Sequence, residues 1–285
     1  MTMTTNFSFD HGTVAVSNLT VAIQSFTEMG FIVTPGGIHQ HGLTQNALIT
    51  FADGSYLELL SLRRQVLKAF VERLEHIGAM NTLASNTARR FLTRYAKGRG
   101  LADFALSTKT LDRTLNVART HGLLIDRPAR TGRIRTDGKV LGWKLGVPPT
   151  FDLPFLIEDI TPRSQRIPDS APRHHPNGVT GIANLVVVVK HLSKTAWRYR
   201  TLGLEPIAIS TSSIPASHQL KIDLKPTTIT LAAPTCKDSE LYYHLSNRGE
   251  GPYLIQLRAT QPASAKTLEL ARAYNVRMEF LLEDS

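Results

Sequence analysis

The strongest constraint on the fold of this chain is an order of strands and a helix that occurs three times along the sequence. The first copy opens with strand-like Phe9–Val16, continues with amphipathic Leu19–Met29, and closes with the strand Ser55–Leu62. Alternating apolar residues predict the strands, while Asn18 before the helix and Gly30 after it predict its two ends. The order is therefore strand, helix, strands.

The same order returns twice further along the chain. The second copy opens with Leu101–Thr108, continues with the helical segment Leu111–His121, and closes with Pro154–Ile160. The third copy follows a proline-rich linker, opens with Ile182–Val189 and closes with Gly251–Leu257. An element order that recurs at this scale indicates one structural unit used repeatedly.

Two landmarks align between the copies and support the repeat. The helix starts are Val16–Leu19, Thr108–Leu111 and Val189–Leu192, and the closing strands contain Ser55–Glu58, Phe155–Glu158 and Tyr253–Gln256. Because both landmarks occur in the same order three times, chance similarity is a poor explanation.

These patterns predict an α+β protein built of repeated βαβββ modules. The predicted divisions are a paired domain over 6–165 with modules at about 8–62 and 101–162 and a helical connector at 64–97, a linker at 166–180, a third βαβββ-like module at 181–262, and a helix and strand at 263–285. An odd number of modules leaves the third free to cover a sheet edge or to pair with its counterpart in a homodimer.

The formal charge of +10 has three explanations. Basic residues gather at Arg89–Arg99 and Arg127–Lys139, but no zinc finger and no aromatic RNA-binding motif accompanies them, which disfavours nucleic acid as a partner. The other two explanations of the charge are a basic surface exposed to solvent and a pocket that attracts a small anion.

Several classes of protein are disfavoured by the sequence. Apolar runs such as Leu185–Val189 fall far short of the roughly 20 residues that span a bilayer, and no secretory signal is visible. The single cysteine, Cys236, excludes an internal disulfide framework. There is no phosphate-binding loop or dinucleotide fingerprint, so we expect no nucleotide cofactor. We expect a cytoplasmic protein without a membrane partner.

The repeat, together with a His in the first strand and a Glu in the closing strand, resembles the vicinal oxygen chelate superfamily, and within it the bacterial glyoxalase-like domain proteins. The motifs that carry the resemblance are Asp10-His11, Val33–Gly37, Gln45–Leu48, Gly54–Leu59, Arg135–Gly138, Trp143, Leu153–Glu158 and His175–Gly178. They cover roughly the first 180 residues. The resemblance implies that two adjacent modules curl into a U-shaped cleft, with metal ligands on the first and last strand of each.

Transferred by position, the resemblance implies a metal site formed by His11, Glu58, Glu158 and Asp103. Asp103 departs from the family pattern, in which His or Glu is usual. The third copy has Asn184 and Gln256 at these positions, so its metal chemistry is expected to be absent.

The physical setting of the two glutamates supports part of this assignment. Glu58 and Glu158 lie in otherwise apolar strands, where an ionised carboxylate costs several kcal/mol unless it is compensated. A divalent metal such as Zn, Mn, Fe, Ni or Co would compensate it. The alternative is structural: each glutamate pairs with an arginine or faces solvent at the rim of the cleft.

The favoured function is a metal-assisted enzyme of lyase or isomerase type acting on a small oxygenated molecule, with Glu158 or Glu58 moving a proton. Asn46, Arg135 and Trp143 are the candidate substrate-binding residues, and the ligand is expected to be anionic. Dioxygenation is disfavoured because its usual iron site needs a second His. The alternative function is non-catalytic sequestration of a small molecule.

The other candidate groups are assigned structural or solvated roles. His39 and His41 are expected in a loop, with a place at the mouth of the cleft as the less favoured alternative. His174 and His175 are expected in the linker, and His191 at a helix start where it caps the helix.

Overall fold

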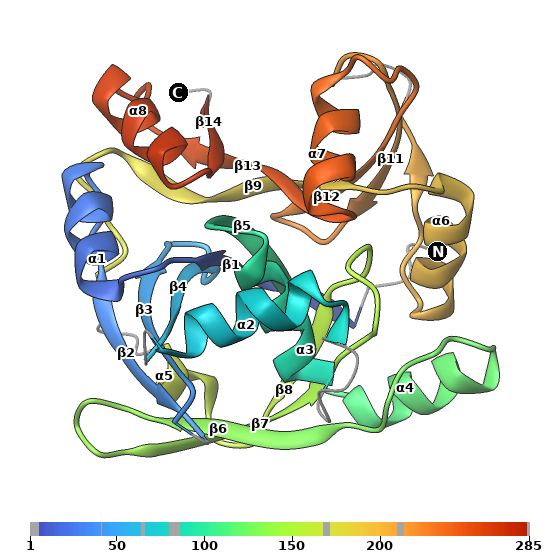
Figure 1. Cartoon of the computed structure of the whole chain (residues 1–285), viewed down its shortest axis with the longest axis horizontal. Helices are drawn as coiled ribbons and strands as arrows, with labels where there is room; N and C mark the ends of the chain where they lie inside the picture. The colour runs from blue at the N-terminus through green and yellow to red at the C-terminus, as the bar shows by residue number, and fades with distance from the viewer. Residues whose placement is uncertain are drawn as a thin grey trace.

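Eight strands of the first two copies close into a barrel, the lower body in Figure 1. The computed structural model describes residues 6–40, 42–63, 66–79, 86–167, 172–209 and 214–283. The barrel strands are β1 (Phe7–Ala15), β2 (Thr34–His39), β3 (Thr44–Thr50), β4 (Tyr56–Leu62), β5 (Gly100–Thr108), β6 (Ala129–Ile134), β7 (Val140–Gly146) and β8 (Phe155–Asp159). Their order around the barrel is β1-β4-β3-β2-β6-β7-β8-β5.

Each half of the barrel is one βαβββ module. In both modules the first strand pairs in parallel with the last, β1 with β4 and β5 with β8, and the two first strands pair antiparallel with each other. Helices α1 (Leu19–Glu28) and α4 (Leu111–Thr120) connect the first strand of each module to its hairpin. Asn18 caps α1 as predicted, since its side chain accepts a hydrogen bond from Val21 N at 3.2 Å. The predicted α+β class and paired modules are confirmed.

The barrel closes where the hairpins of the two modules meet. Only β2 and β6 pair there, with Ile38 opposite Ile134 and His39 opposite Arg133. This short antiparallel contact turns the predicted U-shaped sheet into a continuous wall and encloses its concave face.

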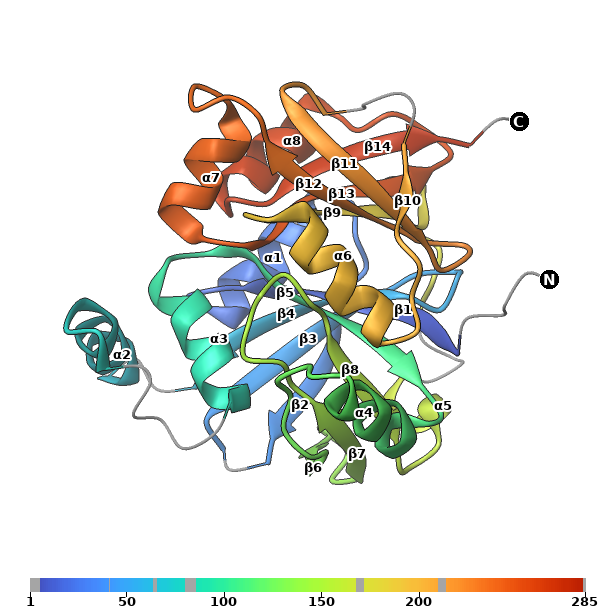
Figure 2. The ribbon, with the colours of Figure 1, turned by 90° about the vertical axis from the view of Figure 1, so that its right-hand side faces the viewer.

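Helices α2 (Val66–His76) and α3 (Asn86–Ala96) connect the two modules. α3 lies against the barrel, whereas α2 stands out from the body (Figure 2). Val71 of α2 is buried in a small cluster with Leu92 and Tyr95 of α3, while Phe70 and Ile77 remain exposed. The predicted connector is thus helical in its described part, and α3 rather than α2 covers the barrel. None of the described helices is long and apolar enough to cross a membrane.

The rest of the chain forms a second, open sheet above the barrel in Figure 1. Its strand order is β10-β11-β12-β9-β13-β14. Its elements, with the short helix that precedes them, are α5 (Arg163–Arg166), β9 (Val179–Val188), α6 (Leu192–Thr201), β10 (Ile207–Ala208), β11 (Ser217–Asp223), β12 (Thr228–Pro234), α7 (Glu240–Arg248), β13 (Gly251–Ala259), α8 (Ala265–Ala273) and β14 (Arg277–Leu282).

The strand that closes the third module is β12, and the prediction that Gly251–Leu257 closes it is wrong. β9 pairs in parallel with β12, as β1 does with β4. β13 instead pairs antiparallel with β9, as β5 does with β1, and continues through α8 into the parallel strand β14. β13 therefore begins a shortened fourth copy. First and last strands both lie mid-sheet with apolar sequences, so the pattern of residues does not distinguish them.

The second sheet shares its core with the outside of the barrel. Leu185 and Val187 of β9 belong to the same buried cluster as Phe26 of α1. Tyr274, after α8, packs edge-on against Phe26 at 5.6 Å, and its hydroxyl lies 3.2 Å from Ser25 Oγ. The third and fourth copies thus support the barrel from outside.

We predict that Gly37 is essential for closure of the barrel. It has a φ of 146°, and a Cβ there would lie 2.2 Å from the carbonyl oxygen of Ile134 across the closing contact. G37A should lower the free energy of unfolding by about 1–3 kcal/mol more than G138A, because the added methyl meets backbone that cannot move aside. Gly138 has a φ of 82°, and a Cβ added there would have no heavy atom within 4 Å. G138A therefore measures the cost of placing alanine at a positive φ without a steric clash. Urea denaturation measures both variants, and equal losses would contradict the steric argument.

Candidate functional site

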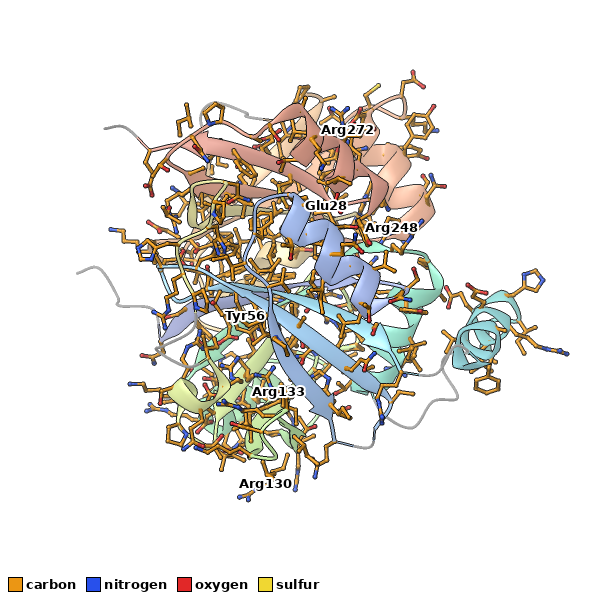
Figure 3. All side chains as sticks on the ribbon, turned by 90° about the vertical axis from the view of Figure 1, so that its left-hand side faces the viewer. Glu28, Tyr56, Arg130, Arg133, Arg248 and Arg272 are labelled. Carbon is orange, nitrogen blue, oxygen red and sulfur yellow. The ribbon has the colours of Figure 1, made fainter. Side chains whose placement is uncertain are left out.

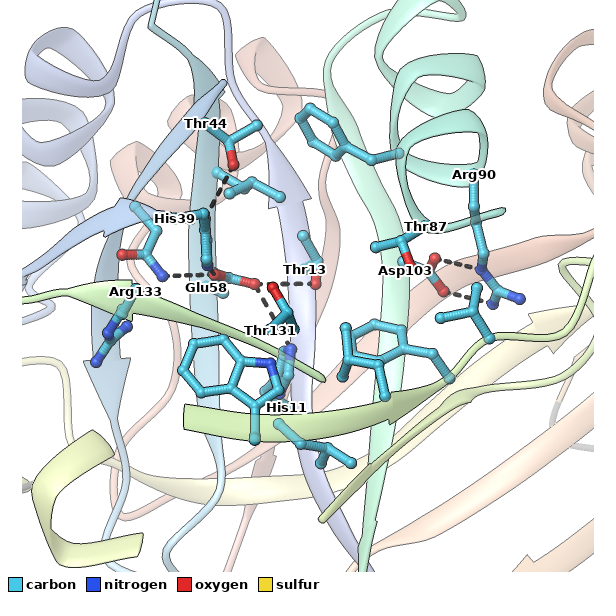
Figure 4. Close-up of a pocket in the computed structure, with 18 of the residues that line it drawn as sticks. His11, Thr13, His39, Thr44, Glu58, Thr87, Arg90, Asp103, Thr131 and Arg133 are labelled. Atoms are coloured by element: carbon cyan, nitrogen blue, oxygen red, sulfur yellow. Dashed lines mark hydrogen bonds and ion pairs between the residues drawn. The ribbon is translucent and has the colours of Figure 1, made fainter. Parts of the chain in front are cut away.

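The interior of the barrel is a cavity of about 470 Å³. Because side chains alternate across a strand, every second residue of the barrel strands points inward. The apolar part of the wall includes Leu60, Trp143, Leu145, Val147, Phe155 and Ile157. One end is covered by Thr87, Arg90, Phe91 and Arg94, whose spacing places them on one face of α3. Figure 4 shows the α3 residues Thr87 and Arg90 facing the barrel strands.

Glu58 of β4 is the carboxylate at the centre of this cavity, and it is only 8% exposed. Its Oε1 accepts a hydrogen bond from Asn46 Nδ2 at 2.5 Å and lies 3.5 Å from His39 Nε2. Its Oε2 lies 3.5 Å from both His11 Nε2 and Thr13 Oγ1. The neighbours come from β1, β2 and β3, and Figure 4 shows His11, Thr13 and His39 around Glu58. Each carboxylate oxygen therefore faces one imidazole.

The surroundings keep Glu58 ionised. Burial alone would raise its pKa, but His39, His11 and the Asn46 hydrogen bond outweigh burial, with help from Arg133. The pKa of Glu58 therefore lies below its ordinary value. A carboxylate with a lowered pKa in a mostly apolar cavity is available as a base at neutral pH.

His11 is held in place from behind by Asp10. An irregularity in the β1–β5 pairing between Phe9 and His11 brings the two neighbouring side chains together, with His11 Nδ1 at 2.7 Å from Asp10 Oδ1. Tyr56 stacks on the His11 ring with centroids 4.5 Å apart. Because an ionised Asp10 accepts from Nδ1, the Nε2 atom is the one that faces Glu58.

Asp10 is completely buried and is held by arginines. Arg166 Nη1 and Nη2 donate to its two oxygens at 2.8 and 2.9 Å, and Arg163 also donates to it. Burial opposes ionisation, but Arg166 and Arg163 outweigh it and hold the pKa of Asp10 well below its usual range. Arg166 also pairs with Asp159 at the end of β8, so the group joins both modules.

His39 lies on β2 and lines the cavity, so the expectation that it belongs to a loop is wrong. Its Nδ1 is 2.9 Å from Thr44 Oγ1, and its ring meets Trp143 edge-on at 6.2 Å. Burial lowers the pKa of His39 below its ordinary value, although Glu58 acts in the opposite direction and Arg133 adds to the lowering. The residues of β2, with one proline and two glycines, show no strand-like alternation, so no local signal in the sequence identifies His39.

Asp103 reaches the cavity wall, but its carboxylate is occupied by Arg90. Arg90 Nε and Nη2 donate to the two oxygens of Asp103 at 2.5 and 2.6 Å. The remaining donors bind carbonyl oxygens of the loop after β7, at Pro148, Thr150 and Leu153. All five N–H donors of this guanidinium are thus used. The group anchors α3 over the cavity.

Glu158 points away from the cavity. Its Oε2 accepts from Leu111 N at 3.0 Å at the start of α4, and its Oε1 lies 3.9 Å from Lys144 Nζ. The register of the strands explains the difference. Phe155 pairs with Ala105, and Glu58 pairs with Thr13. Ala105 and Thr13 hold equivalent positions in the two modules, because each lies five residues before the N-cap of the helix that follows its strand. Phe155 therefore takes the position of Glu58 in the second module.

Of the four residues expected to bind a metal, His11 and Glu58 lie beside each other in the cavity. Asp103 lines the same cavity but is bound by Arg90, and Glu158 faces α4. His39 adds a second imidazole beside Glu58. No group of three or more His, Cys, Asp or Glu side chains in the described part of the chain is arranged to hold a metal ion. The donors present do not fit the expected metal centre.

Two of the three expected substrate-binding residues line the cavity, namely Asn46 and Trp143. Arg135 does not: its Nη1 donates to Gln165 O at 2.9 Å, and its Nη2 pairs with Asp137 at 2.9 Å. Arg133, two residues earlier on β6, lines the cavity instead and donates to Arg166 O at 2.7 Å. Figure 3 places Arg133 within the barrel and Arg130 at its lower edge.

The remaining candidates lie outside this site. His41 is not among the described residues. His175 accepts from Ile32 N at 2.9 Å and its Nε2 lies 3.0 Å from Thr50 O, so it fastens the linker to the barrel. His191 precedes α6, but its side chain makes no capping hydrogen bond. Cys236 is exposed.

Comparison with known proteins agrees with this architecture. The model of a family described as a glyoxalase-like domain matches residues 9–203. A hypothetical protein from Staphylococcus aureus is structurally similar with a TM-score of 0.69 and 13% identity, covering 97% of this chain and 100% of that chain. A mutant of 4-hydroxymandelate synthase from Streptomyces coelicolor is also structurally similar, with a TM-score of 0.54 and 12% identity. The similarity covers 94% of this chain and 74% of that chain. No curated protein matches the sequence. At these identities the structural likeness concerns the fold alone.

We predict that Asp10 makes stability depend on pH. Its pKa is lower in the folded protein than in the unfolded chain, so the unfolded state binds more protons as the pH falls. The stabilisation should be complete above about pH 5 and should be lost as the pH falls through the unfolded-state pKa of about 3.9 towards the folded-state value. Urea unfolding of wild type and D10N at several pH values measures this. The difference in the free energy of unfolding between wild type and D10N should shrink as the pH falls. A difference that stays constant with pH would contradict a lowered pKa of Asp10 in the folded protein.

We predict that Arg90 and Asp103 stabilise the fold as a pair. R90M leaves the Asp103 carboxylate buried without its partner and should cost about 3–5 kcal/mol of the free energy of unfolding. The double variant R90M/D103L should recover part of that loss because no charge remains unpaired. R130M, at an exposed arginine, is the matched control and should change little. A double variant as unstable as R90M would show that the charge pair is unimportant.

Proposed function

The chain belongs to the glyoxalase-like domain family, and from this premise we propose that it is an enzyme that moves a proton on a small oxygenated molecule bound inside the barrel. The observation that carries the proposal is Glu58, a buried carboxylate that lines the cavity with one imidazole beside each oxygen. A base held in this way suits removal of a proton from a carbon next to a carbonyl group.

In the proposed reaction Glu58 takes the proton and the electron pair of the C–H bond forms a carbon–carbon double bond. The carbonyl oxygen then carries the negative charge of an enolate. Arg133, whose side chain lines the same cavity and is 4% exposed, supplies positive charge nearby. Return of the proton to a different position or face gives an isomer, and loss of a group from the enolate gives a lyase reaction.

His11 has a positioning role in this reaction. Its ring is fixed by Asp10 on one side and by the stacked Tyr56 on another, so its Nε2 atom stays beside Glu58 Oε2. The carboxylate is thereby held in one orientation before the substrate arrives, which lowers the cost of reaching the transition state.

The cavity favours an anionic molecule with an apolar body. The charged residues that line it include more arginines than carboxylates: the arginines are Arg90, Arg94, Arg130, Arg133 and Arg166, and the carboxylates are Glu58 and Asp103. Asp10 behind Arg166 offsets part of this excess of arginine. The remaining positive potential attracts anions, while the Trp143 and Phe155 rings contact apolar groups.

A second candidate function is sequestration of the same kind of molecule without reaction. The mostly apolar lining of the cavity favours it, because such a wall binds ligands without any chemistry.

We predict that hydrogen exchange distinguishes these functions. Three 2-oxo acids of increasing apolar size (2-oxobutyrate, 4-methyl-2-oxopentanoate and 2-oxo-4-phenylbutyrate) are incubated with the protein in D₂O, and proton NMR follows replacement of the hydrogens next to the carbonyl. E58Q should lower the rate of enzymatic hydrogen exchange by about 10²–10⁴-fold, which is the usual contribution of a general base. E158Q is the matched control and should keep the wild-type rate, because Glu158 faces α4.

The same assay tests the dependence on metal. Since only His11 and Glu58 of the four expected ligands meet in the cavity, EDTA should leave the exchange rate unchanged. Binding of a probe without exchange would favour sequestration. Exchange that EDTA abolishes would restore the metal-assisted mechanism.

A further inference from the structure

A buried base that exchanges substrate hydrogens with solvent, or that is left protonated by a lyase reaction, needs a way to return its proton to solvent, and this requirement rests on the proposed function. Once Glu58 has taken a proton, the next turnover or exchange cannot begin until that proton leaves. Glu58 is 8% exposed, and both its oxygens are surrounded by side chains. Only His11 and His39 among these neighbours are bases able to accept the proton in the neutral form.

The path through His11 is closed. The His11 side chain is 4% exposed, and its second nitrogen is bound to Asp10. Asp10 is completely buried and is held by Arg166 and Arg163, so its oxygens are already occupied. Tyr56 covers one face of the ring, and Phe155 meets it edge-on at 5.3 Å. A proton passed to His11 has no described route onward.

The path through His39 is the more exposed of the two. Its side chain is 21% exposed, five times the exposed fraction of His11, and it is the last residue of β2. Its Nε2 lies 3.5 Å from Glu58 Oε1, and its Nδ1 lies 2.9 Å from Thr44 Oγ1. Figure 4 shows the ring between Thr44 and Glu58, so one side of it contacts the base and the other points to the hairpin.

We propose that His39 carries protons between Glu58 and solvent. The proton leaves the Oε1 atom of the protonated Glu58 carboxyl and binds the lone pair of His39 Nε2, which regenerates the carboxylate and forms an imidazolium. The imidazolium then releases a proton to water and becomes neutral again. A deuteron from solvent then follows the same path in reverse, from His39 Nε2 to Glu58 Oε1 and on to the enolate carbon. In D₂O the complete cycle thus replaces one C–H of the substrate by C–D and transfers the hydrogen to solvent, with no other reactant.

The charged groups around His39 suit this role. Glu58 faces it from β4 and Arg133 faces it from β6, directly opposite in the closing contact of the barrel. Burial, together with Arg133 and His11, keeps the pKa of His39 below its ordinary value despite Glu58. At neutral pH the ring is therefore free to accept a proton, and it releases that proton readily to water.

The test is rescue of exchange by added imidazole. H39A and H11A are assayed with the 2-oxo acid that wild type exchanges fastest, in D₂O at neutral pH, with increasing imidazole concentration. H39A should exchange about 100-fold more slowly than wild type, at the lower end of the range for loss of a proton-transfer group. Imidazole should restore its rate in proportion to concentration, because the vacated position opens to solvent. H11A, whose position is closed, should not be rescued.

Each outcome decides the proposal. Near-ultraviolet circular dichroism confirms that the variants are folded, and H39Q, which keeps most of the volume but accepts no proton, replaces H39A if that variant unfolds. An H39A rate equal to that of wild type overturns the role of His39 and leaves the proposed function standing. A folded, slow H39A that imidazole does not restore makes His39 structural. No exchange of any probe by wild type overturns the proposed function and the role of His39 together.

Discussion

The buried pair of Asp10 and Arg166 is the interaction on which the rest of the site depends. It joins β1 of the first module to α5, which follows the last strand of the second, and Asp159 and Tyr56 complete the partners of Arg166. A charge pair in such a place is strongly stabilising only while both partners remain, because either one alone is a buried, uncompensated charge. The same Asp10 carboxylate orients His11. One ion pair therefore fixes both the joining of the modules and the direction of an imidazole in the cavity.

The two modules share a fold but have taken opposite roles. In the first module the inward position on the last strand is Glu58, and in the second it is Phe155, which offers only an apolar surface. Asp103 keeps a carboxylate in the second module, but Arg90 uses it to anchor α3. The acidic chemistry of a symmetric fold is thus concentrated on one side, while the other side provides the wall and the cover. This asymmetry accounts for a cavity that has a single ionised carboxylate available to a ligand.

The repeat also explains why the second sheet stays open. Its fourth copy passes from β13 through α8 directly to β14, and it lacks a hairpin corresponding to β6 and β7 in the described residues. Without that hairpin, no strand among the described residues pairs with the other edge of β10 to complete a second barrel. The sheet instead packs one face against the barrel, where β9 shares a core with α1. Its contribution is to support the outside of the barrel that contains the site.

The sequence by itself determined the modules and most strands and helices, because local periodicity and caps report which residues share a face. The resemblance to a family, carried by short motifs, is what placed His11 and Glu58 at one site. Tertiary structure decided the rest. Glu158 was misplaced because a register difference of three residues moves a side chain to the other face of a strand. Asp103 was misjudged because its partner Arg90 comes from the connector, and His39 was missed because only barrel closure brings β2 beside β6. Partners that meet through long-range pairing leave no periodic signal in the residues between them, so only the folded chain reveals them.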